Sequence, residues 1–225
     1  MRPALCVPWC VVALVCSGLR ASGQGSPAVP PPLAPGIQVG QRAPELALLP
    51  FDTIDEEDRV RLADRRARHV VLCFGSYTCP CIRKEAPAIR HLYARFHDSV
   101  AMYFVYIREG HPIDGPNGRE RGENARFGAR EPQTFLERAA LASLCAKRLE
   151  LEMPVLVDEM SNLAQTAYSA WPSRLFVVGP DGRVCYRAPP GPEAFHPSEV
   201  EAALVARGIR PVEPKPSEAP GSGSR

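Results

Sequence analysis

Apolar runs alternate with helical periodicities through the middle of the chain. The runs predict five strands, at His69 to Gly75, Val100 to Ile107, Pro154 to Asp158, Arg174 to Val178 and Arg183 to Arg187. The first three lack strict alternation of apolar and polar positions, which is typical of strands that are covered on both faces. The last two are joined by a turn of Gly, Pro, Asp and Gly, which predicts a hairpin.

Three helices are predicted between and after these strands. The first carries apolar residues at the spacing of one helix face, namely Ile89, Leu92, Tyr93 and Phe96. Thr134 and Glu137 form a capping-box pattern that predicts the start of the second. The apolar side of that helix carries Leu141, Leu144 and Cys145. Ser198 with Glu201 predicts the start of the last helix, and Gly208 its end.

Strands separated by helices imply crossover connections and a mainly parallel sheet. A strand, a Cys-bearing turn, a helix, a strand, a helix and a final hairpin together resemble the thioredoxin order. The segment Val39 to Leu46 resembles the entry segment of redoxin and peroxiredoxin-like proteins, and Trp171-Pro172 resembles the position where thioredoxin folds hold a cis proline. The predicted fold class is therefore α/β and thioredoxin-like, with a central mixed, mainly parallel sheet flanked by helices.

Both ends of the chain differ in composition from the middle. Arg2, the apolar run Cys6 to Leu19 and the small residues after it predict a signal peptide over residues 1–22, with an N-terminal membrane anchor as the alternative. Residues 23–36 are a Pro/Gly-rich linker by composition, and residues 211–225 a disordered tail. The folded domain is predicted over residues 37–210. We expect the protein to be secreted or periplasmic, and membrane-anchored if the first segment is retained.

Charge and cysteine count narrow the function further. The 225 residues carry 27 basic and 25 acidic side chains, a formal net charge of +2, which predicts neither a nucleic-acid partner nor a polybasic membrane patch. Three of the eight cysteines lie in the first 16 residues, and five remain: Cys73, Cys79, Cys81, Cys145 and Cys185. An odd number is unlike a disulfide scaffold and favours a thiol kept for reactivity or burial.

Cys79 is the candidate nucleophile. It follows a buried strand and stands directly before Pro80, and proline is favoured at the first position of a helix. The free backbone amides and the positive dipole end at a helix start stabilise an anion, so we expect Cys79 to ionise more readily than an average cysteine. A purely structural Cys79 is the alternative interpretation.

Cys81 and Cys145 are the candidate resolving thiols. On a helix, residues two apart point to nearly opposite sides, so a bond between Cys79 and Cys81 would require the first turn to unwind. Resolution therefore falls to Cys81 after local rearrangement, to Cys145 or to an outside thiol. Cys145 can equally be a small core residue, and Cys73, inside a buried strand, is expected to fill the core.

Glu109 and His111 follow the second predicted strand. The carboxyl ends of parallel strands build one rim of the sheet, so both residues should face the same region as Cys79. A histidine there can move a proton or hold an anionic substrate, and a surface-loop histidine is the alternative. The stretch Pro116 to Glu131 has no clear periodicity and is either a lid or an insertion.

Several separated motifs resemble the iodothyronine deiodinase family. They run in one order over about residues 71–204: Phe74-Gly75-Ser76-x-Thr78-Cys79-Pro80, Glu109-x-His111-x-x-Asp114-Gly115, Leu136-Glu137-Arg138, Val157-Asp158-x-Met160-x-Asn162, Ala167-Tyr168-x-Ala170-x-x-x-Arg174-Leu175 and Gly191-Pro192. The sequence departs from the family pattern at three positions. The family's second histidine is absent near Pro132, Tyr77 replaces a cysteine, and Cys81 replaces a second proline.

The resemblance implies a role for each matching residue. Cys79 would stand at the position of selenocysteine and accept iodine or an oxidising equivalent. His111 would contact the substrate or transfer a proton, and Glu109 would orient the histidine or its loop. Arg174 would clamp a substrate carboxylate, which suits an arginine fork, with a surface strand residue as the alternative.

The sequence thus predicts a thiol-dependent oxidoreductase. Cys79 would attack a small-molecule or disulfide substrate, in reductive dehalogenation or thiol-disulfide exchange, and an external thiol reductant would restore it without a cofactor or metal. One alternative is a peroxiredoxin-like thiol peroxidase. The other is a copper(I)-binding thioredoxin-fold chaperone, with Cys79, Cys81 and His111 as ligands. The oligomeric state stays open.

Overall fold

A computed structural model describes residues 36–65, 67–115, 127–189 and 194–212. These residues belong to one compact unit of the chain, Leu33–Arg225. The signal peptide or anchor, nearly all of the linker, most of the tail and most of the stretch Pro116 to Glu131 lie outside the described residues, as do Gly191 and Pro192. Over the described ranges, no helix has both the length and the apolar character needed to cross a membrane.

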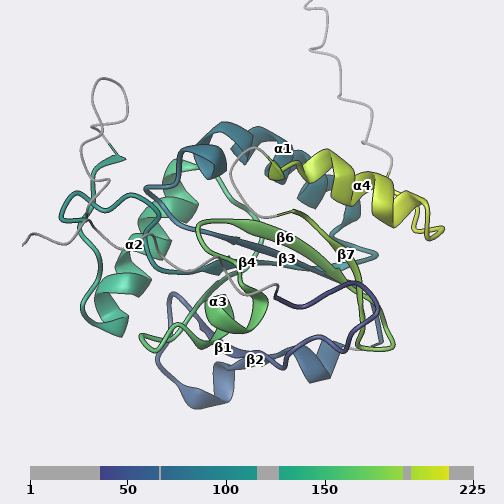
Figure 1. The fold of residues 1–225 in the computed structure, drawn as a ribbon, viewed down its shortest axis with the longest axis horizontal. Coiled ribbons are helices and arrows are strands. Elements are labelled where there is room, and N and C mark those ends of the chain that lie inside the picture. The colour runs from purple at the N-terminus through teal and green to yellow at the C-terminus, as the bar shows by residue number, and fades with distance from the viewer. Residues whose placement is uncertain (1–35, 66, 116–126, 190–193, 213–225) are drawn as a thin grey trace, which may run out of the picture. The chain divides into compact units, whose positions relative to one another are not determined.

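In the described part of the chain, seven strands form one sheet in the order β2-β1-β5-β4-β3-β6-β7 (Figure 1). In chain order they are β1 (Ala47–Pro50), β2 (Val60–Arg61), β3 (Val70–Gly75), β4 (Ala101–Tyr106), β5 (Val155–Val157), β6 (Arg174–Val178) and β7 (Val184–Arg187). The five strands predicted from apolar runs are β3 to β7. Strands β1 and β2 were not predicted, because runs of four and two residues carry too little pattern to recognise.

The sheet is mixed, as predicted, but it is less parallel than expected. Only β3 with β4 and β4 with β5 pair in parallel. Strand β6 is antiparallel to β3 and to β7, and β1 is antiparallel to β5 and to β2. The additional antiparallel pairs come from the unpredicted N-terminal strands and the final hairpin. The inner order β4-β3-β6-β7, with a helix crossing from β3 to β4, is the thioredoxin-like arrangement.

Within the residues that the structure describes, four α-helices flank the sheet, namely α1 (Pro80–Phe96), α2 (Phe135–Arg148), α3 (Leu163–Tyr168) and α4 (Pro197–Val205). The short 3-10 helices η1 (Glu56–Asp58) and η2 (Leu62–Arg65) lie near β2 in the chain. The three predicted helices are α1, α2 and α4. Helix α3 was missed because six residues are too few for a helical period to show.

Helix caps decide where α2 and α4 begin. The predicted capping box of α2 is confirmed: the Glu137 backbone N–H donates to Thr134 Oγ1 at 3.2 Å, and the Thr134 backbone N–H donates to the Glu137 carboxylate at 3.2 Å. The capping box predicted for α4 is wrong. Helix α4 starts at Pro197, so Ser198 lies inside the helix, because proline already has the helical φ and needs no N–H at the first position.

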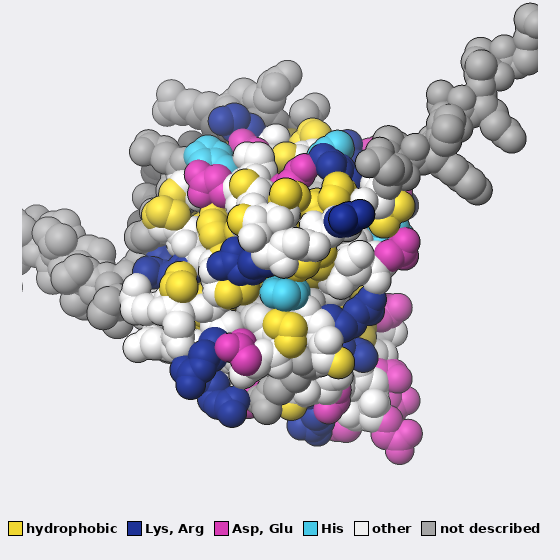
Figure 2. All heavy atoms as spheres, turned by 90° about the vertical axis from the view of Figure 1, so that its right-hand side faces the viewer, with side chains coloured by type: hydrophobic (Ala, Val, Ile, Leu, Met, Phe, Trp, Pro, Cys, Tyr) yellow, Lys and Arg dark blue, Asp and Glu magenta, His cyan; other side chains and the backbone are white. Residues whose placement is uncertain are grey.

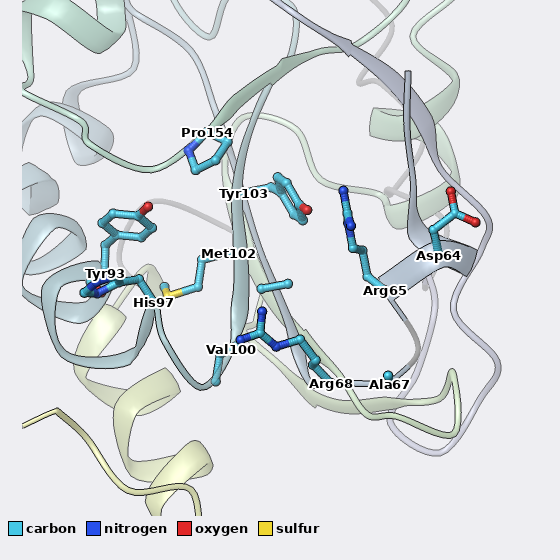
Figure 3. A pocket seen from close by; sticks show the side chains of 11 residues that line it. Asp64, Arg65, Ala67, Arg68, Tyr93, His97, Val100, Met102, Tyr103 and Pro154 are labelled. Carbon is cyan, nitrogen blue, oxygen red and sulfur yellow. The ribbon is translucent and has the colours of Figure 1, made fainter. Parts of the chain in front are cut away.

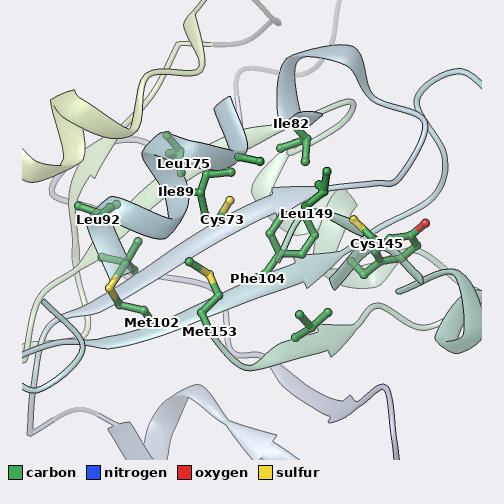
Figure 4. Close-up of a cluster of buried hydrophobic side chains, with 14 of the residues drawn as sticks. Cys73, Ile82, Ile89, Leu92, Met102, Phe104, Cys145, Leu149, Met153 and Leu175 are labelled. Atoms are coloured by element: carbon green, nitrogen blue, oxygen red, sulfur yellow. The ribbon is translucent and has the colours of Figure 1, made fainter. Parts of the chain in front are cut away.

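Two hydrophobic clusters cover the two faces of the sheet. Helices α1, α2 and α4 pack on one face, and α3 with the N-terminal segment packs on the other (Figure 1). Figure 4 shows part of the first cluster, in which Cys73 from β3 and Cys145 from α2 lie among Ile, Leu, Met and Phe side chains. Both cysteines are at most 2% exposed, and burial raises the pKa of both thiols. Cys73 therefore fills the core, as expected.

Candidate active site

Cys79 lies where the end of β3 turns into α1. Its backbone is extended, with φ −75° and ψ 115°, and Pro80 is the first helical residue, as the sequence predicts. The turn brings α1 so close to β3 that a Cβ on Gly75 would lie only 2.5 Å from Ile82 Cδ1. The Trp171-Pro172 peptide bond is cis, and a Cβ on Gly110 would lie 3.5 Å from Cys79 Cβ and 3.4 Å from Pro172 Cβ. Three chain segments therefore meet at Cys79.

The two sulfur atoms of the C-x-C pair are neighbours. Cys79 Sγ lies 3.2 Å from Cys81 Sγ, and both cysteines are free thiols. The expectation that the two side chains point to opposite sides is wrong. It treated both residues as helical, whereas the extended backbone of Cys79 swings its side chain toward Cys81 in the first turn. The helix therefore need not unwind for the sulfurs to meet.

Ser173 completes the sulfur site. Its hydroxyl lies 2.9 Å from Cys81 Sγ. The pKa of Cys81 is lowered to about 7, because the Cys79 thiol and then the Ser173 hydroxyl donate to its thiolate and outweigh burial. The hydrogen bond with Cys81 and then burial raise the pKa of Cys79. The expectation that Cys79 ionises more readily is thus wrong for the free pair, in which Cys79 keeps the proton and Cys81 carries the negative charge.

A buried carboxylate supports the turn from behind. Glu109 is 2% exposed and accepts hydrogen bonds from the backbone N–H of Thr78 at 2.8 Å and from its hydroxyl at 2.6 Å. The Tyr106 hydroxyl also donates to Glu109. Burial raises the pKa of Glu109, although the bonds from Thr78 and Tyr106 oppose that shift. The acid therefore holds the residue that directly precedes Cys79.

His111 lies on the same rim. Its backbone N–H donates to the Thr78 hydroxyl at 3.0 Å, so one threonine connects Glu109 and His111. The imidazole Nδ1 is buried and has no hydrogen-bond partner within the described protein. Thr78 thus brings the two predicted site residues to the segment that carries Cys79.

Arg174 is a buried cation and not a surface strand residue. It is 2% exposed at the start of β6, opposite Phe74 of β3, and directly follows the Ser173 that contacts Cys81. Its Nε and Nη1 atoms find no acceptor in the described part of the protein. Burial and then the charge of Arg187 lower the pKa of Arg174 to about 10. A buried guanidinium without a counter-charge is costly, and an anionic ligand would offset that cost.

Cys145 belongs to the same buried cluster as Cys79 and Cys81, but it is not hydrogen-bonded to either within the described residues. It is fully buried on the apolar side of α2. The three candidate copper ligands also do not form a donor set. In the described ranges, no three His, Cys, Asp or Glu side chains are grouped to hold a metal ion, and so Cys79, Cys81 and His111 do not converge.

Two cavities lie at opposite ends of the sheet. A cavity of about 480 Å³ borders the site and is lined by Glu109, Gly110 and Trp171 together with residues of the following loop and α2. The pocket in Figure 3, about 240 Å³, surrounds the start of β4 at Val100 and Ala101 and is therefore remote from Cys79. On the face shown in Figure 2, basic, acidic and apolar side chains are interspersed, in keeping with the small net charge.

Sequence reasoning missed the roles of three residues that build the site. Thr78 joins Glu109 to His111, Ser173 contacts Cys81, and Tyr106 donates to Glu109. Ser173 could have been found from its place after Trp171-Pro172, which the thioredoxin order already puts beside the thiol. Thr78 was found as a position of the deiodinase-like motif, but its role was not predicted, and Tyr106 gave no signal, because a tyrosine in a strand has many structural roles.

Comparisons with known proteins show the family of the chain. The family model for iodothyronine deiodinase matches residues 34–207. The chain belongs to the iodothyronine deiodinase family. Thyroxine 5-deiodinase of Gallus gallus is 32% identical over 168 residues, covering 74% of this chain and 62% of that protein. Type I iodothyronine deiodinase of Xenopus laevis is 31% identical over 140 residues, covering 61% and 52%. This family member thus spans less than two thirds of the length of these relatives.

Solved structures support the fold of this iodothyronine deiodinase family member. A protein from Sinorhizobium meliloti has a TM-score of 0.52 at 16% identity, with 80% of this chain and 90% of that chain covered. A thiol:disulfide interchange protein from Bacteroides has a TM-score of 0.50 at 16% identity, with 74% and 90% covered. Both similarities concern the fold, which is thioredoxin-like.

Proposed function

We propose that this deiodinase-family chain is a thiol-dependent oxidoreductase in which Cys79, at the position of the family's selenocysteine, attacks an electrophilic substrate. The observation that carries the proposal is the dithiol at the start of α1, whose sulfurs lie 3.2 Å apart. A pKa of about 7 at Cys81 keeps a thiolate in this pair near neutral pH. A sulfur site that serves only packing has no need of an ionised thiol.

The proton of the pair decides how Cys79 becomes a nucleophile. In the resting pair, the Cys79 thiol donates to the Cys81 thiolate. As Cys79 attacks, its proton passes to Cys81 across this hydrogen bond, so Cys81 acts as the general base. The hydrogen bonds to Cys81 keep the negative charge on Cys81 in the resting pair, and the charge moves to Cys79 only as the new bond to the substrate forms. Cys79 thus gains its nucleophilic form at the moment of attack, even though its own pKa is raised.

The substrate class follows from the groups around the sulfurs. Among the described residues, two buried nitrogen atoms of Arg174 and the buried Nδ1 of His111 have no hydrogen-bond partner. An arginine fork suits a carboxylate, and the imidazole can donate to or accept from a phenol oxygen. We therefore propose a small molecule that carries a carboxylate and a reducible bond, either an aryl iodide or a disulfide. The relatives named thyroxine 5-deiodinase support the aryl iodide.

The remaining parts of the reaction lie outside the chain. An external thiol restores the sulfur site, because the reduction of a substrate consumes the electrons of the dithiol. We propose no metal or organic cofactor. The apolar segment near the N-terminus supports a protein that is secreted or periplasmic, and retention of this segment as a membrane anchor is the alternative.

Mass spectrometry of Cys79 tests the proposal. The full chain is treated separately with hydrogen peroxide, oxidised glutathione and an iodinated phenol that bears a carboxylate, and each cysteine is then mapped. We expect the aryl iodide or the disulfide to oxidise the site in the native chain and to leave it unmodified in Cys79→Ser. Fastest reaction with peroxide would favour the thiol peroxidase alternative. No modification by any reagent would rule out catalysis by Cys79.

A further inference from the structure

The C-x-C pair carries a role that goes beyond nucleophilic attack. We infer that Cys79 and Cys81 close into a reversible disulfide in each cycle, with Cys81 as the resolving thiol and Ser173 as the residue that positions it. The inference rests on the proposed function, because it describes how the oxidised state of Cys79 is resolved.

The distance between the sulfurs already allows this bond. A disulfide requires about 2.05 Å between sulfurs, so the observed 3.2 Å must shorten by little more than an ångström. Cys79 precedes the helix with an extended backbone, and its side chain makes no capping hydrogen bond to α1. The side chain can therefore rotate without breaking a hydrogen bond of the helix. The closure is therefore a local movement of two side chains, not an unfolding of α1.

Burial favours an internal resolving thiol over an external one. Cys79 is 1% exposed, so a second molecule has little access to its sulfur once a substrate group is attached there. Cys81 is 7% exposed and already in contact with Cys79, which makes its attack intramolecular. Cys145 is the other internal candidate, but it is fully buried and burial raises its pKa, so it holds little thiolate.

The electrons and protons balance for a disulfide substrate. Cys79 attacks one substrate sulfur and passes its proton to Cys81, and the first half leaves as a thiolate that takes this proton. The Cys81 thiolate then attacks Cys79 Sγ, forms the Cys79–Cys81 bond and expels the second half as a thiolate. The dithiol is oxidised by two electrons, and the substrate disulfide is reduced to two thiol products. An external dithiol reverses the oxidation by the same exchange.

An aryl iodide substrate leads to the same oxidised form of the protein. The carbon–iodine bond breaks, iodine transfers to Cys79 Sγ, and the aryl carbon takes the proton that Cys79 held. The Cys81 thiolate then attacks Cys79 Sγ and releases iodide. In both reactions the oxidised protein contains one internal disulfide and no attached substrate group.

Ser173 is the positioning residue for this step. Its hydroxyl lies 2.9 Å from Cys81 Sγ, on the side where the segment after Pro172 approaches α1. A hydroxyl donor stabilises the thiolate, and it fixes the sulfur beside Cys79 in the position from which it attacks. The serine touches neither the substrate nor Cys79 in this arrangement, so its effect acts through Cys81.

The test compares intermediates in the full chain after one equivalent of oxidised glutathione. The reaction is quenched in acid, and the peptides are mapped at successive times. We expect the native chain to lose two thiols and form the Cys79–Cys81 disulfide without a lasting glutathione adduct. In Cys81→Ser and Cys81→Ala, Cys79 should keep one glutathione, with a lifetime at least roughly 100-fold longer, since an intramolecular thiol has a high effective concentration.

Two further variants separate the roles. Cys185→Ser, at a partly buried thiol away from the pair, should behave as the native chain does. Ser173→Ala should raise the pH at which the adduct resolves and slow resolution at pH 7 by roughly 3- to 10-fold, since one hydrogen bond to the thiolate is lost. Ser173→Thr keeps the hydroxyl, so the adduct should resolve with the same pH dependence as in the native chain. A merely structural role of Ser173 would not require this recovery.

The outcomes distinguish this inference from the proposed function. A lasting glutathione adduct on Cys79 of the native chain, unchanged resolution in both Cys81 variants, or a bond from Cys79 to Cys145 would overturn the inference and leave Cys79 as the nucleophile. An adduct that forms first on Cys81, in the native chain and in Cys79→Ser, would reverse the two roles and overturn it as well. Absence of any reaction at either sulfur would overturn both proposals.

Discussion

The carboxylate of Glu109 accepts two hydrogen bonds from Thr78, one from its backbone N–H at 2.8 Å and one from its hydroxyl at 2.6 Å. Thr78 directly precedes Cys79, and its hydroxyl also accepts the backbone N–H of His111. A buried acid thus fixes the turn that presents the reactive sulfur. The arrangement makes the stability of the fold and the geometry of the site depend on one residue.

Substitution of Glu109 by glutamine should destabilise the protein. At acidic pH the carboxyl group is protonated but both of its oxygens can still accept, whereas the amide places an NH2 group at one of these positions, so one donor from Thr78 or Tyr106 loses its partner. We expect the free energy of unfolding to fall by about 2 kcal/mol at acidic pH, as measured by urea titration. Glu57→Gln, at an exposed carboxylate, should change it by less than about 0.5 kcal/mol.

The difference in stability between the native chain and Glu109→Gln should change with pH in a definite direction. Burial raises the pKa of Glu109 in the folded state above its value of 4.5, so the folded protein binds more protons than the unfolded chain between these two pKa values. Stability from this group therefore falls as pH rises through that window. The advantage of the native chain over Glu109→Gln should be largest below about pH 4.5 and should shrink above it. An advantage that grows with pH would contradict the raised pKa.

Two glycines near Cys79 should respond differently to alanine. A Cβ on Gly75 would lie 2.5 Å from Ile82 Cδ1 and 3.1 Å from Phe104 Cζ, so Gly75→Ala must push α1 from β3 and cost about 1–3 kcal/mol. A Cβ on Gly110 has only ordinary contacts, the nearest at 3.4 Å. Gly110→Ala should keep its stability, yet slow the reaction of Cys79 with bulky disulfides more than with peroxide. Equal slowing for both reagents would contradict a steric role at Cys79.

Thiol labelling should show the charge on the C-x-C pair directly. The pKa of Cys81 is about 7, whereas burial raises the pKa of Cys185 above its value of 9.0. Because the thiolate is the reactive form, iodoacetamide labelling of Cys81 should rise with pH and reach half of its maximum near pH 7. At that pH the thiolate fraction of Cys185 should be lower by a factor of roughly 50 or more. Cysteine mapping by mass spectrometry measures both rates in one sample, and coincident pH profiles would contradict the assignment.

Arg174 offers a test that separates stability from function. Two nitrogen atoms of its buried guanidinium have no acceptor in the ranges that the structure describes, so an apolar side chain of similar length should fit the site at least as well. We expect Arg174→Met to raise the free energy of unfolding by about 1 kcal/mol or more. The same variant should lose roughly 10- to 100-fold in rate for an iodinated phenol that bears a carboxylate, since one charged hydrogen bond is removed.

The matched control for Arg174 is the same phenol without its carboxylate. Its rate should hardly change in Arg174→Met, because no group is present for the arginine to bind. Equal losses for both phenols, together with a less stable protein, would show that Arg174 has a structural role instead.

The sequence predicted the long strands and helices better than it predicted the geometry of the site. Long apolar runs such as Val70–Gly75 and a helical period ending at Phe96 predicted β3 and α1, because burial on a sheet and on a helix produces different spacings. The short elements β1, β2 and α3 carry too few residues for any period. Their positions depend on tertiary pairing, as in the antiparallel contact of β1 with β5.

The site could be predicted by residue type but not by geometry. Cys79 stood out by its place before Pro80, and Glu109 by its place after a strand. The contact between Cys79 and Cys81 could not be predicted, since it depends on the extended backbone of a single residue. Nor could the sequence assign the charge of the pair, because the pKa of Cys81 depends on Ser173, which is 92 positions away.

Turnover with a chemical reductant tests the central claim, catalysis through Cys79, most directly. The native full chain, Cys79→Ser and Cys185→Ser are each incubated with dithiothreitol and an iodinated phenol that bears a carboxylate, and released iodide is measured over time. We expect the native chain and Cys185→Ser to release many equivalents of iodide, at a rate at least roughly 100-fold above that of Cys79→Ser, since covalent catalysis needs the nucleophile. Equal iodide release by the native chain and Cys79→Ser would contradict the claim.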